Sequence, residues 1–189
     1  MAIALRPATA ADEAFLWEML YLASHLGDEG IPASATRAHP GVARYLNGWG
    51  RPHDLGVVAA DAGRPVGAAW ARLLSGDEQG YGHVDDRTPE LAIAVVPTHR
   101  RLGVGRALLA ALIDAARGTY PALSLSVRAD SDAVRLYRRL GFQPVPGTEH
   151  TDGRGGVSTM RLSLAQVSRG GGKRSAYPSA DVDPPVGNR

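Results

Sequence analysis

The sequence contains no cysteine among its 189 residues. This absence excludes disulfide bonds, a thiolate nucleophile and zinc sites built on thiolates. The sequence also lacks any apolar run close to the ~20 residues that a membrane-spanning helix needs. Its first residues lack the basic and then apolar pattern of a secretory signal. We therefore expect a soluble, cytoplasmic protein with no membrane partner.

The main body of the sequence also lacks a basic excess. Lysine and arginine together number 21 against 19 aspartates and glutamates, which gives a formal net charge of +2. Residues 165–189 alone carry this excess, so residues 1–164 are neutral. Because proteins that bind duplex nucleic acid present a basic face to the phosphates, no nucleic-acid partner is expected. The histidines show no metal-ligand spacing, so no metal site is predicted.

The length of the chain suits a single domain with a sizeable core. A domain of ~150 residues already buries about 70% of the surface of its extended chain. Residues 1–164 contain all the periodic apolar segments, whereas residues 165–189 contain a glycine run followed by Ser, Pro and charged residues without periodicity. We predict a folded domain over residues 1–164 and a disordered tail over residues 165–189.

The apolar pattern predicts strands and helices that alternate along the domain. Strands are expected at residues 3–5, 56–60, 65–73, 91–96, 124–127 and 159–164. Helices are expected at residues 9–24, 42–46, 103–117 and 133–140, with a polar loop at residues 75–89. The turn at residues 61–64 predicts an antiparallel hairpin, and residues 153–156 a hairpin tip. This order indicates an α/β fold with a sheet of mixed strand direction.

The stretch from residue 90 to residue 116 carries the most informative pattern. An apolar run over residues 91–96 is followed by a helical apolar stripe over residues 104–115. Between them the chain reads Arg100-Arg101-Leu102-Gly103-Val104-Gly105. Glycines lack a Cβ, so a bound group can approach the backbone, and the first N–H groups of a helix have no intrahelical partner. The turn therefore suits an anion such as a pyrophosphate.

Taken alone, this turn admits two interpretations. It lacks the third glycine of the dinucleotide fingerprint, because Leu108 stands there, and it lacks the Gly-Lys-Ser/Thr of a Walker A loop. Glycines that only ease the packing of a strand against a helix would have the same spacing. The residues further along the chain bear on this choice.

Two motifs together resemble the GNAT superfamily of N-acetyltransferases. The order Arg-x-x-Gly-x-Gly after an apolar strand is similar to the acetyl-CoA pyrophosphate motif of that family. Residues 131–142 read Ser-Asp-Ala-Val-Arg-Leu-Tyr-Arg-Arg-Leu-Gly-Phe and resemble the family pattern Asn-x-Ala-x-x-Leu-Tyr-x-x-Leu-Gly-Phe. The resemblance covers about residues 1–164. One departure is Ser131, which stands where the family usually has Asn.

The resemblance implies a mixed, mostly antiparallel sheet flanked by helices, with its two central strands splayed to admit acetyl-CoA as cosubstrate. It implies that Val95 and Val96 pair with the pantetheine arm and that an N–H of one of them polarises the thioester carbonyl. Ser131 would replace part of the usual amide contact to pantetheine. The pyrophosphate would be held by the side chains and N–H groups of Arg100, Arg101, Leu102, Gly103, Val104, Gly105, Arg106 and Ala107.

The resemblance also implies catalytic roles for two residues. Tyr137 matches the usual general acid of the family, and a phenol of pKa near ~10 can protonate a CoA thiolate of pKa about 8.5. The alternative is that Tyr137 only fills the apolar face of its helix. Glu90 would lie near the acceptor, where it is the candidate base for the amine proton. A carboxylate that only attracts a cationic substrate or meets an arginine fits the sequence equally well.

The predicted activity is acetyl transfer from acetyl-CoA to a primary amine. Transfer is expected to be direct, in a ternary complex, because the chain has no cysteine to carry an acyl intermediate. The acceptor is a small-molecule amine or a protein N-terminus, and family members are often dimers, so a homodimer is one option. The alternative is a non-catalytic acyl-CoA-binding module on the same fold, because fold does not fix function.

Overall fold

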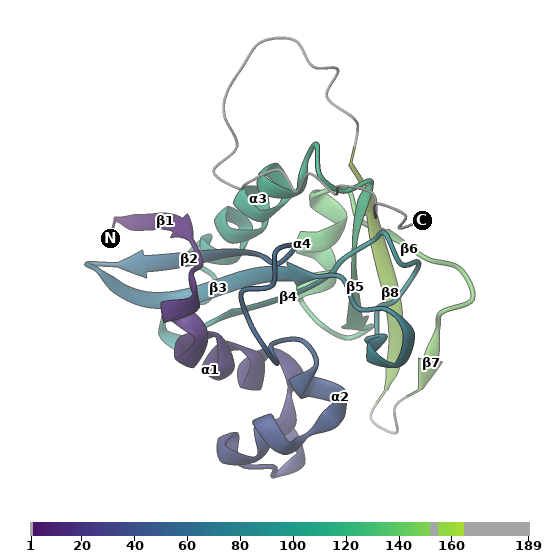
Figure 1. Ribbon diagram of the computed structural model, residues 1–189, viewed down its shortest axis with the longest axis horizontal. Coiled ribbons are helices and arrows are strands. Elements are labelled where there is room, and N and C mark those ends of the chain that lie inside the picture. Colours follow the sequence, from purple (N-terminus) through teal and green to yellow (C-terminus); the bar gives the residue numbers. More distant parts are fainter. Residues whose placement is uncertain (1, 152–154, 165–189) are drawn as a thin grey trace, which may run out of the picture.

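The computed structural model describes residues 2–151 and 155–164, and its strands form one mixed sheet (Figure 1). In chain order they are β1 (Ile3–Pro7), β2 (Leu55–Asp61), β3 (Arg64–Arg72), β4 (Glu90–Val95), β5 (Ala122–Arg128), β6 (Gln143–Pro144), β7 (His150–Thr151) and β8 (Gly156–Ser163). Across the sheet the order is β1-β2-β3-β4-β5-β8-β6, and β7 also pairs with β8. Strands β4 and β5 are parallel, whereas the other described pairs are antiparallel.

Helices cover both faces of this sheet. They are α1 (Glu13–Ser24), α2 (Pro40–Ala43), α3 (Val104–Ala116) and α4 (Ala133–Arg139). Short 3-10 turns lie at Ala10–Asp12, Leu26–Glu29, Ala33–Ala38, Gly76–Glu78 and Pro97–His99. Helices α3 and α4 pack into one core cluster, and α1 and α2 pack into another. Figure 1 shows α3 above the sheet and α1 and α2 below it, so the fold has the three layers expected of this α/β class.

The central strand β4 is apolar on both faces because both faces are covered. Ile93 and Val95 contact the cluster that contains α3, whereas Ala92 and Ala94 contact the cluster that contains α1. Successive side chains of a strand point to opposite faces, which explains this division. Glu90 has the same parity as Ala92 and Ala94, so its side chain lies on the α1 and α2 face.

Helix α3 follows the expected periodicity closely. Its buried side chains include Val104, Leu108 and Leu112, which recur every four residues along one stripe. Burying a large aliphatic side chain contributes about 1.5–3 kcal/mol before the cost of ordering it. Gly103, with φ of 85°, precedes the helix in the left-handed conformation that only glycine adopts readily. The predicted helix over residues 103–117 is therefore confirmed.

The two central strands separate as the resemblance implied. In the described chain, β4 and β5 are in register at the pair Glu90 and Ser124 alone. Beyond this pair, β4 continues alongside β3 as far as the pair of Val95 with Gly67, while β5 continues alongside β8. We call the region where β4 and β5 diverge the fork. It leaves one backbone edge of β4 without a strand partner.

Other elements differ in detail from the sequence-based expectation. The expected helix from residue 9 opens with a 3-10 turn, in which the Asp12 carboxylate accepts hydrogen bonds from the Thr9 N–H and from Arg6. The two-residue strands β6 and β7 were not expected, because two residues are too few to show an alternation. The predicted tail and residues 153–154 of the predicted hairpin tip lie outside the described residues. Within those residues, no helix combines the length and the apolar character needed to cross a membrane.

Candidate active site

The backbone of β4 presents hydrogen-bonding groups to the fork. The Val96 N–H donates to the Val66 carbonyl at 2.9 Å, so it points toward β3. Because backbone groups alternate in direction along a strand, the N–H and carbonyl of Val95 point to the fork instead. The sequence analysis expected an N–H of either Val95 or Val96 to face the thioester. In the structure the Val95 N–H points to the fork, and the Val96 N–H does not.

The turn before α3 exposes several backbone donors. Arg101 and Gly103 have φ values of 62° and 85°, so both lie in the left-handed conformation. Among the described residues, the N–H groups of Leu102 to Arg106 have no backbone acceptor. A left-handed arginine is unusual, and such a conformation persists where the surroundings or a function require it. Free N–H groups at the start of a long helix form a site for an anion.

Two arginines flank these donors. The Arg100 guanidinium donates to the Val95 carbonyl at 3.0 Å, so it closes the open edge of β4 at the mouth of the fork. The Arg101 guanidinium lies 3.2 Å from Asp132, just before α4, and both side chains are more than four-fifths exposed. An ion pair so exposed contributes little to stability, which leaves Arg101 available to an anionic ligand.

The start of α4 lies beside this turn. The Ser131 hydroxyl accepts a hydrogen bond from the N–H of Ala133, the first residue of α4, at 3.2 Å. Its hydroxyl hydrogen is still available to donate to a ligand. A Cβ built on Gly105 would meet Leu136 at 3.8 Å and Ile93 at 3.9 Å, which shows how closely the first turn of α3 approaches α4 and β4. The two sequence motifs therefore meet at the fork.

Tyr137 lies on the buried face of α4. Its ring meets Phe142 edge-on, with centroids 5.8 Å apart. Burial raises the pKa of Tyr137 to about 12, so the phenol is neutral and a hydrogen donor at neutral pH. No hydrogen bond to its hydroxyl is found within the described part of the chain. An unpaired phenol is suited to meet a group that is not part of the protein.

Glu90 is an almost fully buried carboxylate at the closed end of the fork. Its carboxylate oxygen Oε2 accepts hydrogen bonds from the Tyr45 hydroxyl and from the Gly82 N–H, each at 2.7 Å. The other oxygen, Oε1, is buried and has no partner among the described residues, and the same holds for the hydroxyl of Ser124. Burial raises the pKa of Glu90, whereas the Tyr45 hydroxyl, the backbone N–H groups of Gly82 and Gly80 and the charge of His83 oppose this effect. A carboxylate with a raised pKa is a better proton acceptor.

A glycine-containing loop segment closes over Glu90. A Cβ on Gly80 would lie 2.5 Å from Glu90 Oε1, and a Cβ on Gly82 would lie 2.6 Å from the carbonyl carbon of Leu125. Only glycine allows this backbone to fit between the carboxylate and β5. Sequence reasoning described residues 75–89 only as a polar loop. The closely spaced pair of glycines around Tyr81 was the signal that could have indicated a close backbone approach.

A buried ion pair anchors the segment that carries Tyr45. The Arg72 guanidinium binds both carboxylate oxygens of Asp54, at 2.6 and 2.8 Å, and both side chains are almost fully buried. Arg72 also donates to the carbonyls of Arg44, Asn47 and Gly48. This arginine therefore fixes the turn after α2 against β3. Sequence reasoning missed this ion pair, because Arg72 and Asp54 lie far apart along the chain.

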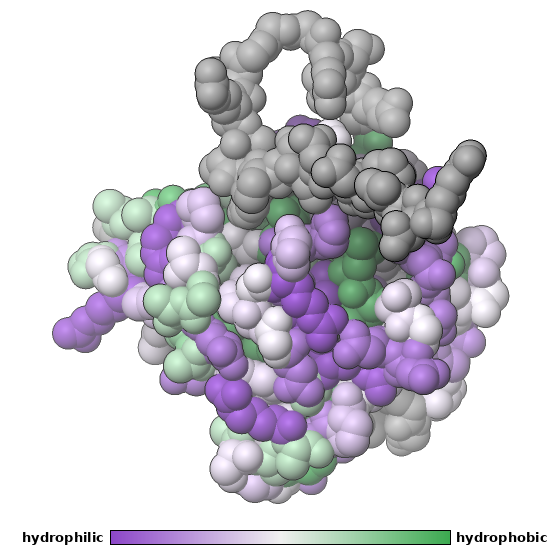
Figure 2. Space-filling model, in the orientation of Figure 1, coloured by the Kyte–Doolittle hydropathy of each residue, from purple (hydrophilic) through white to green (hydrophobic). Residues whose placement is uncertain are grey.

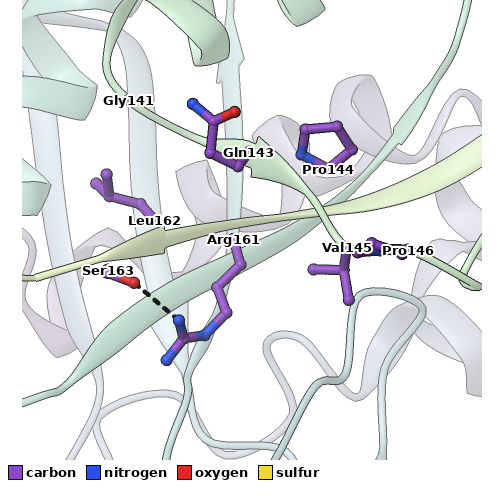
Figure 3. A pocket seen from close by; sticks show the side chains of 8 residues that line it. All are labelled: Gly141, Gln143, Pro144, Val145, Pro146, Arg161, Leu162 and Ser163. Carbon is purple, nitrogen blue, oxygen red and sulfur yellow. Dashed lines mark hydrogen bonds between the residues drawn. The ribbon is translucent and has the colours of Figure 1, made fainter.

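Two surface hollows in the described part of the chain lie away from the fork. One of about 390 Å³ is lined by residues of β6, β8 and the loop that follows β6, with Arg161 donating to Ser163 across it (Figure 3). None of the predicted site residues lines it. On the face drawn in Figure 2, hydrophobic residues occur in small groups among hydrophilic ones. No group of three potential metal ligands occurs among the described residues.

Comparison with known protein sequences agrees with this geometry. The model of the acetyltransferase (GNAT) family matches residues 17–142. N-alpha-acetyltransferase RimI of Mycobacterium tuberculosis is 38% identical to this chain over 100 residues. That match covers 50% of this chain and 55% of the relative, so the chain spans about half the length of this curated relative.

Solved structures share the fold. A ribosomal-protein-alanine N-acetyltransferase from Brucella melitensis superposes with a TM-score of 0.64 at 24% identity, covering 85% of this chain and 99% of that chain. A GNAT superfamily phosphinothricin acetyltransferase from Sinorhizobium meliloti, in complex with AcCoA, superposes with a TM-score of 0.63 at 24% identity, covering 94% of this chain and 97% of that one. These likenesses confirm the expected fold class.

Proposed function

The chain belongs to the acetyltransferase (GNAT) family, and from this premise we propose that it transfers an acetyl group from acetyl-CoA to a primary amine. The observation that carries the proposal is the placement of the open edge of β4 beside the free N–H groups that begin α3. The first can pair with an extended amide-containing arm, and the second with a pyrophosphate. Acetyl-CoA has both groups at opposite ends of one molecule.

Several residues fit acetyl-CoA as substrate. The N–H groups of residues 102–106, with Arg100 and Arg101, would hold the pyrophosphate. The Ala107 N–H, which the resemblance also implied, donates to the Gly103 carbonyl at 3.1 Å instead. The Arg100 guanidinium would leave the Val95 carbonyl and donate to a phosphate instead. That carbonyl could then accept a hydrogen bond from the pantetheine arm. Ser131 would donate its hydroxyl hydrogen to the same arm, and Val96 would contact it through its side chain.

The proposed chemistry is direct transfer in a ternary complex. The amine nitrogen attacks the thioester carbon, the C–S bond breaks, and the thiolate takes a proton from the Tyr137 hydroxyl. Glu90 takes the proton that the amine loses. The Val95 N–H would donate to the carbonyl oxygen as negative charge develops there. Because Glu90 is enclosed by residues 80–82, the acceptor has to displace this segment or reach Glu90 through a water molecule.

We propose a protein or peptide N-terminus as the first acceptor to test. Two of the similar proteins support this choice. One is named as an N-alpha-acetyltransferase, and the other as a ribosomal-protein-alanine N-acetyltransferase. An α-amine has a pKa near ~7.8, so a larger share is neutral at pH 7 than for an alkyl amine of pKa ~10.4. Small-molecule amines are the second class. A cytoplasmic location and a homodimer complete the proposal, and analytical ultracentrifugation would test the homodimer.

Calorimetry with acetyl-CoA, followed by CoA-thiol release in the same sample, tests this function. The acceptors are a peptide with a free N-terminal alanine, the same peptide with its N-terminus blocked, and a panel of small amines. Binding together with turnover on the free peptide or on one amine class is the expected result. Binding without turnover would favour the non-catalytic acyl-CoA-binding module, and no binding would contradict both.

A further inference from the structure

Glu90 is held by groups that have no role in the mechanism described so far. The Tyr45 hydroxyl and the Gly82 N–H both donate to the same oxygen, Oε2, at 2.7 Å. The second oxygen, Oε1, is buried against the backbone of Gly80 and has no well-aligned hydrogen-bond donor within the described chain. A carboxylate bound on one side only presents its other oxygen in a fixed direction. Such an arrangement is what a proton acceptor needs.

We propose that Tyr45 is a positioning residue for Glu90, which holds Oε2 so that Oε1 receives the proton of the acceptor amine. This inference rests on the proposed function, because it assigns Tyr45 a part in the same reaction. Tyr45 is not proposed to touch either substrate. It acts through the carboxylate, by fixing its orientation and by stabilising its ionised form.

Tyr45 is itself fixed at both ends, as a positioning residue has to be. Its hydroxyl accepts a hydrogen bond from the Tyr81 N–H at 2.8 Å, so its own hydrogen is directed to Glu90. Its carbonyl accepts from the Trp70 indole at 3.1 Å. On either side of it, the carbonyls of Arg44 and Asn47 accept from the buried Arg72 guanidinium. The phenol therefore reaches Glu90 from a backbone that is anchored to β3.

The charged and titratable groups around Glu90 leave Tyr45 as its principal side-chain donor. Burial raises the pKa of Glu90, and the charge of His83, on the loop over the site, lowers it by a smaller amount. Arg72 lies opposite Glu90 in the β3–β4 register, but it is paired with Asp54. On β5 the register neighbour is the neutral Ser124. The buried residues of α1, which packs against β4, are apolar: Leu16, Trp17, Met19 and Leu20.

Replacing the phenol of Tyr45 tests whether this residue positions Glu90 or only links the turn after α2 to the sheet. Tyr45→Phe keeps the ring and removes the donor to Glu90. Because the hydrogen bond favours the charged carboxylate, its loss should raise the pKa of Glu90. The acidic limb of kcat/KM, measured with the alanine peptide, should shift upward by about one pH unit. The acceptor is the same for every variant, so its own ionisation cancels in the comparison.

Tyr120→Phe is the matched control. The Tyr120 hydroxyl is part-buried and also donates at 2.7 Å, but to the carbonyl of His53 and not to a carboxylate. This variant should lose a similar amount of stability and leave the acidic limb in place. If Tyr45→Phe leaves the limb unmoved, or if both variants move it equally, Tyr45 is only a structural residue.

Carbon-13 NMR of labelled carboxylates reports on Glu90 without requiring activity. Its signal is assigned by its disappearance in Glu90→Gln, and its titration should shift upward in Tyr45→Phe. If the wild type gives no turnover, the proposed function fails, yet this titration still tests Tyr45. Should Tyr45→Phe not fold, wild-type protein labelled at the tyrosine Cζ suffices. The Tyr45 signal should then follow the Glu90 titration with the same midpoint, and a signal that does not follow it overturns the proposal.

Discussion

Glu90 and Ser124 form the register pair at which the parallel strands β4 and β5 meet before they diverge. The proposed base therefore lies at the closed end of the fork, where its position is fixed by the sheet. The Val95 N–H lies further along β4, on the edge that β5 has left. Acetyl-CoA bound along that edge would bring its thioester toward Glu90. The fork would then place the acetyl donor and the acceptor amine next to each other.

Tyr137→Phe should reduce turnover far more than acetyl-CoA affinity. The substitution keeps the ring against Phe142 but removes the only proton that this side chain can give to the thiolate. A lost general acid costs on the order of 10²-fold in rate. Steady-state kinetics and calorimetry on the same preparation check this expectation, with Tyr120→Phe as the control. Equal losses in kcat and in affinity would contradict an acid role.

Arg101→Ala should weaken acetyl-CoA binding by about tenfold, since it removes a charge-assisted contact to a phosphate. Asp132→Ala is its control, because it breaks the same exposed ion pair and leaves the arginine in place. Affinity should be unchanged or slightly higher in this variant. Calorimetry at two salt concentrations measures the acetyl-CoA affinity of both variants. A similar loss in the two variants would mean that the ion pair, and not a phosphate contact, is what matters.

Local patterns predicted the parts of the site that are continuous in sequence. The strand, turn and helix around Gly103 were expected from the apolar period and from the glycines, and they are confirmed. Which of Val95 and Val96 directs its N–H to the fork could not be predicted, because the direction of each N–H depends on the pairing of β4 with β3. The enclosure of Glu90 could not be predicted either. It needs Tyr45 and Gly82, which come from different loops and meet only in the folded chain.

Arg72→Leu should lower the free energy of unfolding by about 3–5 kcal/mol. The change leaves the buried Asp54 carboxylate without its partner, and breaking a buried ion pair on one side costs about this much. Arg51→Leu is the comparison, since Arg51 pairs with Glu78 at a distance of 2.9 Å on the surface, where such a pair contributes about 0–1 kcal/mol. Urea unfolding of the wild type and both variants measures these changes in the free energy of unfolding. Similar values for the two would argue against the anchoring role of Arg72.

Asp12→Asn should destabilise the protein at neutral pH and much less in acid. Hydrogen bonds from Arg6 lower the pKa of Asp12 to about 2 in the folded state, against an ordinary value of 3.8. The stabilisation is therefore complete above pH 3.8 and is lost as the pH falls toward 2. Melting temperatures of wild type and variant should differ at pH 6 and converge near pH 2. A difference that does not depend on pH would mean that the pair contributes by packing alone.

Glu90→Gln should depress activity mainly at lower pH. A primary amine is mostly protonated there, so the reaction depends on a base that takes its proton. As the pH rises, neutral amine becomes abundant and the need for the base falls. The ratio of wild-type to variant kcat/KM should therefore be largest just above the pKa of Glu90 and should decrease toward pH 9.

Glu78→Gln makes the same chemical change on the exposed side chain that pairs with Arg51, so it controls for the loss of one negative charge. Its ratio to wild type should stay near one at every pH. A Glu90→Gln ratio that is large but constant with pH would mean that Glu90 orients the acceptor without taking its proton. In that case the enclosed carboxylate would accept a hydrogen bond from a neutral amine, which would have lost its proton to solvent before binding.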